Sequence, residues 1–300
     1  MTKSKQISPS KLALGMIGAA MVPAAATAEE TGAGITLSFD AGIGTGDASN
    51  RIFQNKLGTD DFNEFSTDTA FVGSVGASGA INNTWDWKLS VSRTEYTNNV
   101  FNTDDIFDAD TGSLKAEKSS AAYNATVGRS FETAGASSRL GLGLAYGSST
   151  ETADKGVFYY DSGADDDYFA ETDYETTFQG IGPRLTVDVE SAPVSKNGRL
   201  SLIGGADVNV LYGKYTESKG INAYDGAGGF PGNGSGSERT SGSMVTAGLY
   251  LGAKYQVSDV SAVRFGLRHD VSKADIDSNF ISDRYDDSLT SAFIGLDVKF

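Results

Sequence analysis

Two long stretches of alternating polarity, at residues 177–190 and 199–215, constrain this chain more than any other feature. Apolar side chains occupy every second position of the first stretch, with polar or small residues between them. The second stretch repeats this period, although Ile203 and Leu211 interrupt its polar face. A period of two predicts strands rather than helices. Strands of soluble domains have about 5–6 residues, and these are more than twice as long. One apolar and one polar face over such a length is typical of a wall between lipid and a wet lumen.

Similar alternation recurs along the chain, so the sequence predicts ten strands. Each is long enough to cross a bilayer as a tilted strand, which takes about 9–11 residues. If residues 44–68 contain a hairpin around Phe62 and Phe65, the number becomes twelve. The eight further segments are 35–43, 69–81, 84–97, 119–131, 139–149, 241–256, 260–272 and 289–300.

The connections between these segments alternate strictly in length. The long ones are 44–68, 98–117, 150–173, 217–239 and 273–287, and the short ones are 82–83, 132–138, 191–198 and 257–259. A soluble β-sandwich would share the alternating strands, but it does not predict this sorting of loop lengths. The pattern predicts an all-β fold: a single transmembrane antiparallel up-and-down β-barrel of about ten strands, with long extracellular loops and short periplasmic turns.

The N-terminus has the three parts of an export signal. Lys3, Lys5 and Lys11 precede or begin an apolar segment, and Ala26-Thr27-Ala28 is a small-residue cleavage site. The apolar part is shorter than the roughly 20 residues of a membrane-spanning helix. We therefore expect a signal peptide at 1–28 and one barrel domain at 29–300, located in the bacterial outer membrane. The chain has no cysteine, so disulfides and thiolate metal sites are not expected.

Acidic residues are concentrated in the five long connections. The formal net charge is -15, and the predicted strands and turns together are close to neutral. Acidic loops keep an exposed surface soluble and repel nucleic acid. They could also attract divalent cations, but runs such as Asp165-Asp166-Asp167 lack the spacing of a calcium loop and are more typical of solvated loops. We expect no metal site and no cofactor.

The last residue, Phe300, closes an alternating strand. A terminal aromatic residue resembles the signal by which bacterial outer-membrane proteins are recognised for assembly, although it can also be an ordinary strand end. The expected partners are therefore outer-membrane lipid, lipopolysaccharide and the barrel-assembly machinery, with no nucleic acid. Further aromatic residues are either interfacial girdles or ordinary strand packing: Trp85, Tyr123, Phe131, Tyr212, Tyr255 and Phe300.

Several motifs resemble the Legionella-type pore-forming major outer membrane proteins. The stretch from Phe178 to Arg184, FQGIGPR, is similar to an FxGxGPR stretch of that family, and residues 210–213, VLYG, are similar to its LLYG. The segments at 85–92 and 127–131 resemble its tryptophan-bearing strand and its GRxF turn region. The resemblance implies a β-barrel pore without catalytic residues. The loops do not match, and the chain is short for the family.

If the apolar faces meet lipid, the opposite faces point into the lumen. The candidate pore-lining residues are then Asp40, Asp86, Lys88, Arg139, Arg184, Asp188, Asp207, Lys254, Arg264, Arg268, Asp270, Asp297 and Lys299. Buried charges need partners, so ladders of acid–base pairs are expected. Rings of charge can tune ion selectivity, but paired charges can also fill a barrel of ten strands, because barrel width grows with strand number.

Two functions remain open at this stage. The first is a porin-like passive pore for ions and small solutes. The alternative is a non-conducting structural or surface-binding barrel that acts through its acidic loops. An enzyme is not expected, because the single histidine, His269, points to the opposite face from Asp270, and no base lies near a nucleophile.

Overall fold

The computed structural model describes residues 34–48, 65–102, 113–133, 135–161, 167–225, 232–277 and 282–300. The predicted signal peptide and the tips of the five long connections lie outside these residues. The described residues form ten strands: β1 (Ile35–Ala48), β2 (Phe65–Ala80), β3 (Trp85–Asn102), β4 (Ser113–Thr133), β5 (Ala136–Asp161), β6 (Asp167–Ser191), β7 (Leu200–Asp225), β8 (Gly232–Ser258), β9 (Ser261–Asp277) and β10 (Ser282–Lys299).

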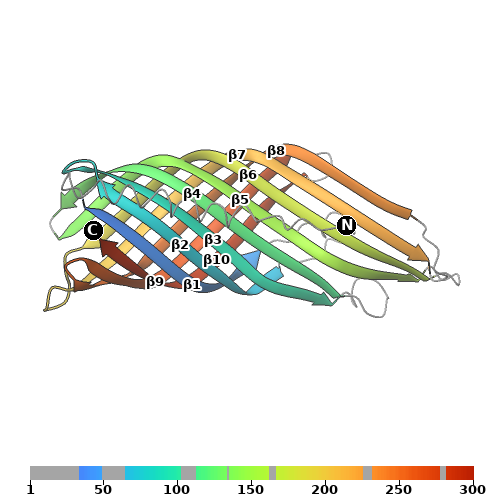
Figure 1. The fold of residues 1–300 in the computed structure, drawn as a ribbon, viewed down its shortest axis with the longest axis horizontal. Coiled ribbons are helices and arrows are strands. Elements are labelled where there is room, and N and C mark those ends of the chain that lie inside the picture. Colours follow the sequence, from blue (N-terminus) through green and yellow to red (C-terminus); the bar gives the residue numbers. More distant parts are fainter. Residues whose placement is uncertain are drawn as a thin grey trace.

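Each strand pairs antiparallel with its neighbours in sequence, and β1 pairs with β10 to close a barrel (Figure 1). The closing register runs from Thr36 opposite Lys299 to Asp47 opposite Ser288. The all-β barrel fold and the count of about ten strands are therefore confirmed. Residues 49–64, which contain most of the hairpin considered as an alternative, lie outside the described residues. No helix in the described part of the chain is long and apolar enough to cross a membrane.

Four short connections define one end of the barrel, called the turn end below. In the first turn, the Asn82 side chain accepts hydrogen bonds from the backbone N–H groups of Thr84 and Trp85, both at 2.9 Å. Gly135 and Gly198 have positive φ angles of 93° and 70° in the second and third turns, a conformation that glycine adopts at low cost. The opposite end, where the long connections lie, is called the loop end.

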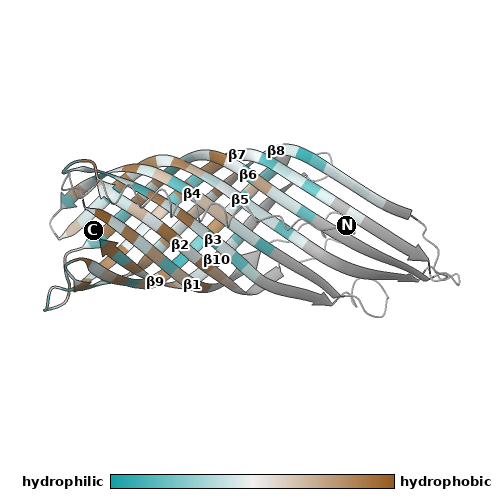
Figure 2. Cartoon of the chain, viewed as in Figure 1, coloured by the Kyte–Doolittle hydropathy of each residue, from teal (hydrophilic) through white to brown (hydrophobic). Residues whose placement is uncertain are grey.

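Exposed apolar side chains form a continuous band around the outside of the barrel, called the apolar belt below. In Figure 2 the hydrophobic positions gather in the half of the barrel where the C-terminus lies. A band of exposed leucine, isoleucine and phenylalanine is costly in water and is the expected surface of a strand wall in lipid. Its members include Phe39, Ile43, Phe71, Leu89, Val127, Leu142, Leu144, Ile181, Leu185, Leu202, Leu249, Leu251, Phe265, Leu267, Ile294 and Leu296.

Aromatic side chains lie at both borders of the belt. Trp85 and Tyr255 are exposed near the turn end, and Tyr212 is exposed at the border facing the loop end. Tyr123 packs against Tyr146 with ring centroids 5.8 Å apart. The candidates for girdle residues thus flank the belt, although Tyr123 also contributes to ordinary cross-strand packing.

The strands continue well beyond the belt, and this corrects the predicted loop lengths. Strands β5 to β8 have 26, 25, 26 and 27 residues, and Figure 1 shows them extending farthest toward the loop end. Much of 150–173, 217–239 and 273–287 is therefore strand rather than loop. Once a strand leaves lipid, its outer face is polar, as at Thr150 and Lys214, so alternation disappears from the sequence although the strand continues.

The two apolar residues that interrupt the alternation of β7 point into the barrel. Leu211 is buried with Ala145, Phe178, Tyr215 and Ala274 in one interior cluster, against which Met244 packs. The rings of Phe178 and Tyr215 lie with centroids 4.6 Å apart. Interior apolar packing close to the border of the belt explains the break in polarity at Leu211, and Ile203 is buried as well.

Candidate functional site

The barrel interior gathers charged and polar side chains from all ten strands. Every sequence-predicted pore-lining residue except Lys299 forms an ion pair in the structure. Lys299 is exposed beside the turn end and forms no ion pair with any described residue. The expected acid–base ladder is present, and its function as the lining of an open pore stays a prediction.

Arg139 on β5 is the centre of the first cluster. Its Nε donates to Asp86 on β3 at 2.6 Å, and its two terminal nitrogens donate to Thr186 and Thr126, each at 3.2 Å. Asp188 lies 3.5 Å from the same guanidinium. The side chain is only 7% exposed. A planar fork held by four partners is the geometry in which arginine is favoured over lysine.

A lysine and a tyrosine extend this first cluster across the lumen. Lys88 on β3 pairs with Asp188 on β6 at 2.7 Å, and Tyr250 on β8 donates to the other oxygen of Asp188 at 3.0 Å. These contacts join strands that are not neighbours in the wall. They therefore pass through the interior rather than along its surface.

Arg264 on β9 organises a second cluster on the other side of the barrel. It lies 2.9 Å from Asp40 on β1 and 3.1 Å from Asp297 on β10. Ser74 and Ser38 donate to Asp40 and Asp297 at 2.8 and 2.7 Å. The two carboxylates thus each have a cation and a hydroxyl donor.

A third cluster links β4, β6, β7 and β9. Arg184 lies 3.3 Å from Asp207 and donates to Asn209 and Asn124 at 2.9 and 3.2 Å. Arg268 lies 2.9 Å from Asp207 and 2.6 Å from Asp270. The Asp207 side chain is 9% exposed, and it is compensated by two guanidinium groups, as a buried carboxylate requires.

Lys118 on β4 and Asp287 on β10 pair across the interior beyond the apolar belt, and Ser272 also donates to Asp287 at 3.2 Å. Burial lowers the pKa of Lys118, but the negative charges of Asp287 and Glu151, the nearby Tyr96 and the hydrogen bond to Asp287 together outweigh burial, so the pKa lies above its ordinary value. Sequence reasoning missed this pair because both residues fall at or near segments expected to be loops. The candidate lining also left out Asn124, Asn209 and Tyr250, although the alternation of their strands places all three on the inward face.

Interior glycines make room for these side chains. A Cβ added at Gly128 or Gly141 would overlap the guanidinium of Arg139. A Cβ at Gly295 would meet Asp40, and one at Gly205 would meet the ring of Tyr250 at 2.6 Å. Glycine in a strand often marks a close approach, and here the approaching groups are the charges and aromatic rings of the lumen.

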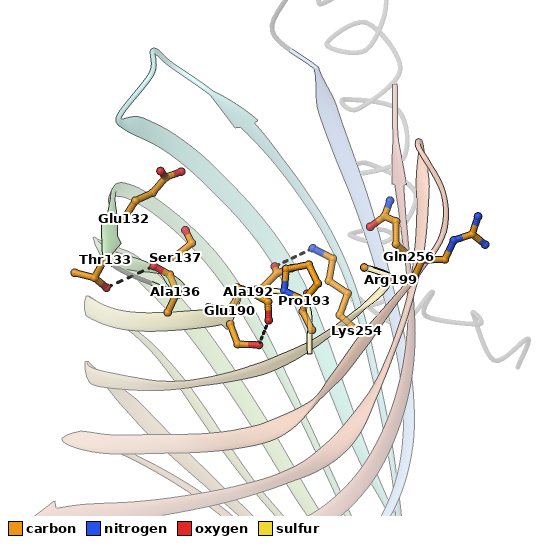
Figure 3. Close-up of a pocket in the computed structure, with 14 residues that line it drawn as sticks. Glu132, Thr133, Ala136, Ser137, Glu190, Ala192, Pro193, Arg199, Lys254 and Gln256 are labelled. Atoms are coloured by element: carbon orange, nitrogen blue, oxygen red, sulfur yellow. Dashed lines mark hydrogen bonds and ion pairs between the residues drawn. The ribbon is translucent and has the colours of Figure 1, made fainter. Parts of the chain in front are cut away.

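The first two clusters are together called the charged tier below, and two cavities lie in the described part of the barrel. The upper cavity, about 460 Å³, extends toward the loop end, and Lys88, Arg139, Asp188 and Arg264 lie in its lining. The second cavity, about 420 Å³, opens at the turn end between the turns at 132–137 and 190–201. Figure 3 shows its rim, including Glu190 and Lys254, which pair at 2.9 Å. No residue lines both cavities, and the residues of the charged tier that line a cavity, such as Arg139 and Arg264, line only the upper one.

The histidine lies away from this network. His269 is exposed on the outer face of β9, and its Nδ1 lies 2.9 Å from the hydroxyl of Thr290. Asp270 points inward to Arg268, so the two do not form a pair. Among the described residues no group of three or more histidine, aspartate or glutamate side chains could hold a metal ion.

Solved structures are similar to this fold. The outer membrane protease OmpT from Escherichia coli matches with a TM-score of 0.50 and 11% identity, covering 89% of this chain and 96% of that one. The fold is that of an outer-membrane β-barrel. A major outer membrane protein from Thermus thermophilus has a TM-score of 0.41 and 11% identity over 89% of this chain and 99% of its own. The identity is too low to carry any function from one barrel to another.

No family model matches the chain. No curated protein matches it either. The resemblance to the Legionella-type pore-forming proteins therefore stays a prediction, whereas the wider assignment to outer-membrane β-barrels rests on the fold and the apolar belt.

Proposed function

We propose that this protein is a bacterial outer-membrane β-barrel that does not conduct in its resting state and acts at the cell surface through its loop end. The observation that carries the proposal is the charged tier, in which every cation has an acidic partner and long side chains cross the lumen. Ions passing this level would have to break those pairs. The extension of β5 to β8 beyond the apolar belt supports a role for the loop end outside the membrane.

The remaining parts of the proposal concern location and assembly. A barrel with this apolar belt fits three further expectations. The chain would be exported through a signal peptide cleaved after Ala28 and assembled through the C-terminal strand that ends at Phe300. Its outer surface would contact lipopolysaccharide. The protein would have no catalytic activity, which agrees with the outward position of His269. Its binding partners at the surface would meet the acidic tips of the long connections.

A porin-like pore is the second candidate, and the upper cavity favours it. Serine is the commonest residue of its lining, and polar groups facing the interior are expected for a wet passage. In a pore, Arg184→Ala or Arg264→Ala should change conductance or ion selectivity. In a closed barrel the same substitutions should mainly lower stability, because each removes one cationic partner of a carboxylate inside the barrel.

Single-channel recording separates the two functions. Residues 29–300 would be refolded, shown to be folded by circular dichroism and by a gel shift, and added to planar bilayers beside a heat-denatured control. Silence from folded protein is the expected result. Discrete conductance steps that the denatured control lacks would overturn the closed barrel in favour of the pore, and reversal potentials would then give its selectivity.

A further inference from the structure

We propose that the upper cavity binds a small neutral polyhydroxylated solute of the size of a monosaccharide. The inference rests on the proposed closed barrel, because without the charged tier as a floor this space would be a length of channel. A volume of about 460 Å³ lies within the range of about 300–1,000 Å³ that is usual for small-molecule sites.

The two sides of the cavity differ in chemistry. Strands β2, β3 and β4 contribute small hydroxyl side chains, among them Ser74, Ser92, Thr94 and Ser120. The opposite side, from β6 to β9, contributes the arginines and carboxylates of the third cluster. Many of the short side chains on the β2–β4 side are serine and threonine, so this part of the wall offers hydrogen-bonding groups to the space.

Charge in the lining selects against ionic ligands. The lining contains five acidic and five basic side chains. Each basic one is already paired, as in Lys88 with Asp188 at 2.7 Å and Arg268 with Asp270 at 2.6 Å. A charged solute would lose its hydration without gaining an unpaired partner.

A wholly apolar ligand is also disfavoured, because it would leave the serine and threonine hydroxyls on the β2–β4 side without hydrogen-bond partners, at a cost for each group. A neutral molecule with several hydroxyl groups can satisfy serine hydroxyls and the exposed edges of the ion pairs together. Among neutral solutes, this wall therefore fits a polyol.

Phe293 adds a flat apolar surface. It points into the lumen from β10 opposite Gly42 on β1 and Gly266 on β9, so no neighbouring side chain at its own level covers the ring. It is half-buried and meets Tyr250 edge-on at 6.5 Å. An aromatic face beside hydroxyls and paired carboxylates matches a sugar ring, which has an apolar C–H face and hydroxyl groups at its edge.

Equilibrium dialysis of radiolabelled D-glucose against the folded chain 29–300 in detergent tests the proposal. Ser92→Leu would fill the cavity from β3, and Ser241→Leu, the same change at an exposed position outside the cavity on β8, is the matched control. We expect saturable glucose binding that weakens at least about tenfold in Ser92→Leu, the equivalent of one or two hydrogen bonds, and is unchanged in Ser241→Leu. If Ser92→Leu does not fold, Ser92→Ala, which removes only the hydroxyl, should weaken binding in the same direction.

Absence of saturable binding, or equal loss in Ser92→Leu and Ser241→Leu, would overturn the proposal and leave a cavity that holds only water. Gluconate and toluene serve as charged and apolar competitors. Displacement of glucose by either as effectively as by unlabelled glucose would overturn the assignment to neutral polyols. Conductance measured without sugar tests separately whether the charged tier closes the barrel. A barrel that conducts and still binds glucose would reject the proposed non-conducting function but not the glucose site.

Discussion

At the scale of single residues, the lumen is built by pairing long charged side chains with glycines. Arg139 reaches Asp86 on β3 because Gly128 on the strand between them, and Gly141 on its own strand, leave the space that a Cβ would fill. The sequence shows inward glycines and inward charges, but it does not show which glycine lies under which side chain. That relation depends on the register between strands, which a single sequence does not fix.

Gly128→Ala should therefore lower stability. The added methyl group would overlap the guanidinium of Arg139, which four partners hold in place, and overpacking of this kind costs about 1–3 kcal/mol. Gly73→Ala is the matched control, because its nearest contact would be the Asp40 carbonyl oxygen at 4.0 Å. The free energies of unfolding in urea would be compared. Equal values for both variants would contradict the packing described for Arg139.

Arg139→Lys should also be destabilising although it keeps the charge. A lysine ammonium cannot reach Asp86, Thr126 and Thr186 together, because it lacks the planar fork. The loss of two or more hydrogen bonds should cost about 1–3 kcal/mol. Arg199→Lys, at an exposed position on the turn end, should change the free energy of unfolding by less than about 0.5 kcal/mol. A similar loss in both variants would show that the fork is not needed.

At the scale of strands, each element is a lipid-facing segment followed by a water-facing one. The lipid-facing segment was predictable, because Leu140, Leu142 and Leu144 alternate with inward residues. The water-facing part of β5 was not, since its outer face carries residues such as Thr150 and both faces become polar. Hydrophobic periodicity reports burial or lipid contact and not strand geometry itself.

An arginine scan along β5 should locate the border between the two segments. Leu142 is 64% exposed within the apolar belt, so Leu142→Arg should cost about 2–4 kcal/mol in lipid. Thr150→Arg, on the same outer face but beyond the belt, should change stability by less than about 0.5 kcal/mol. Urea unfolding in phospholipid vesicles measures both. If Thr150→Arg is as costly as Leu142→Arg, the membrane reaches farther along β5 than the apolar belt indicates.

At the scale of the whole molecule, strand number and the polar interior were predictable from alternation and connection length. Closure of β1 on β10 followed from the barrel fold, and its register is set by contacts such as Ser38 with Asp297 at 2.7 Å. The contacts that cross the interior were not predictable. They join non-neighbouring strands, such as Lys88 with Asp188, and sequence periodicity carries no information about contacts across a lumen.

Removing one ion pair of the charged tier should join the two cavities and open the barrel. In the double variant Arg139→Ala with Asp86→Ala, both charges are lost together, which limits the penalty of an unpaired buried charge. The side chains that fill the space between β3 and β5 disappear with them. We expect discrete conductance steps from the folded variant in planar bilayers, and silence from the unmodified barrel.

The matched control is Lys254→Ala with Glu190→Ala, which removes an ion pair at 2.9 Å from the rim of the second cavity and leaves the charged tier intact. This variant should stay silent. Conductance steps in both double variants would show that any loss of interior charge opens the barrel. If both variants are silent and the gel shift confirms that they are folded, the third cluster or the Lys118–Asp287 pair closes the lumen without the tier. Conductance steps in the Arg139→Ala, Asp86→Ala variant alone would locate the closure of the lumen at Arg139. Each double variant loses one ion pair, and the two pairs lie at different levels of the lumen.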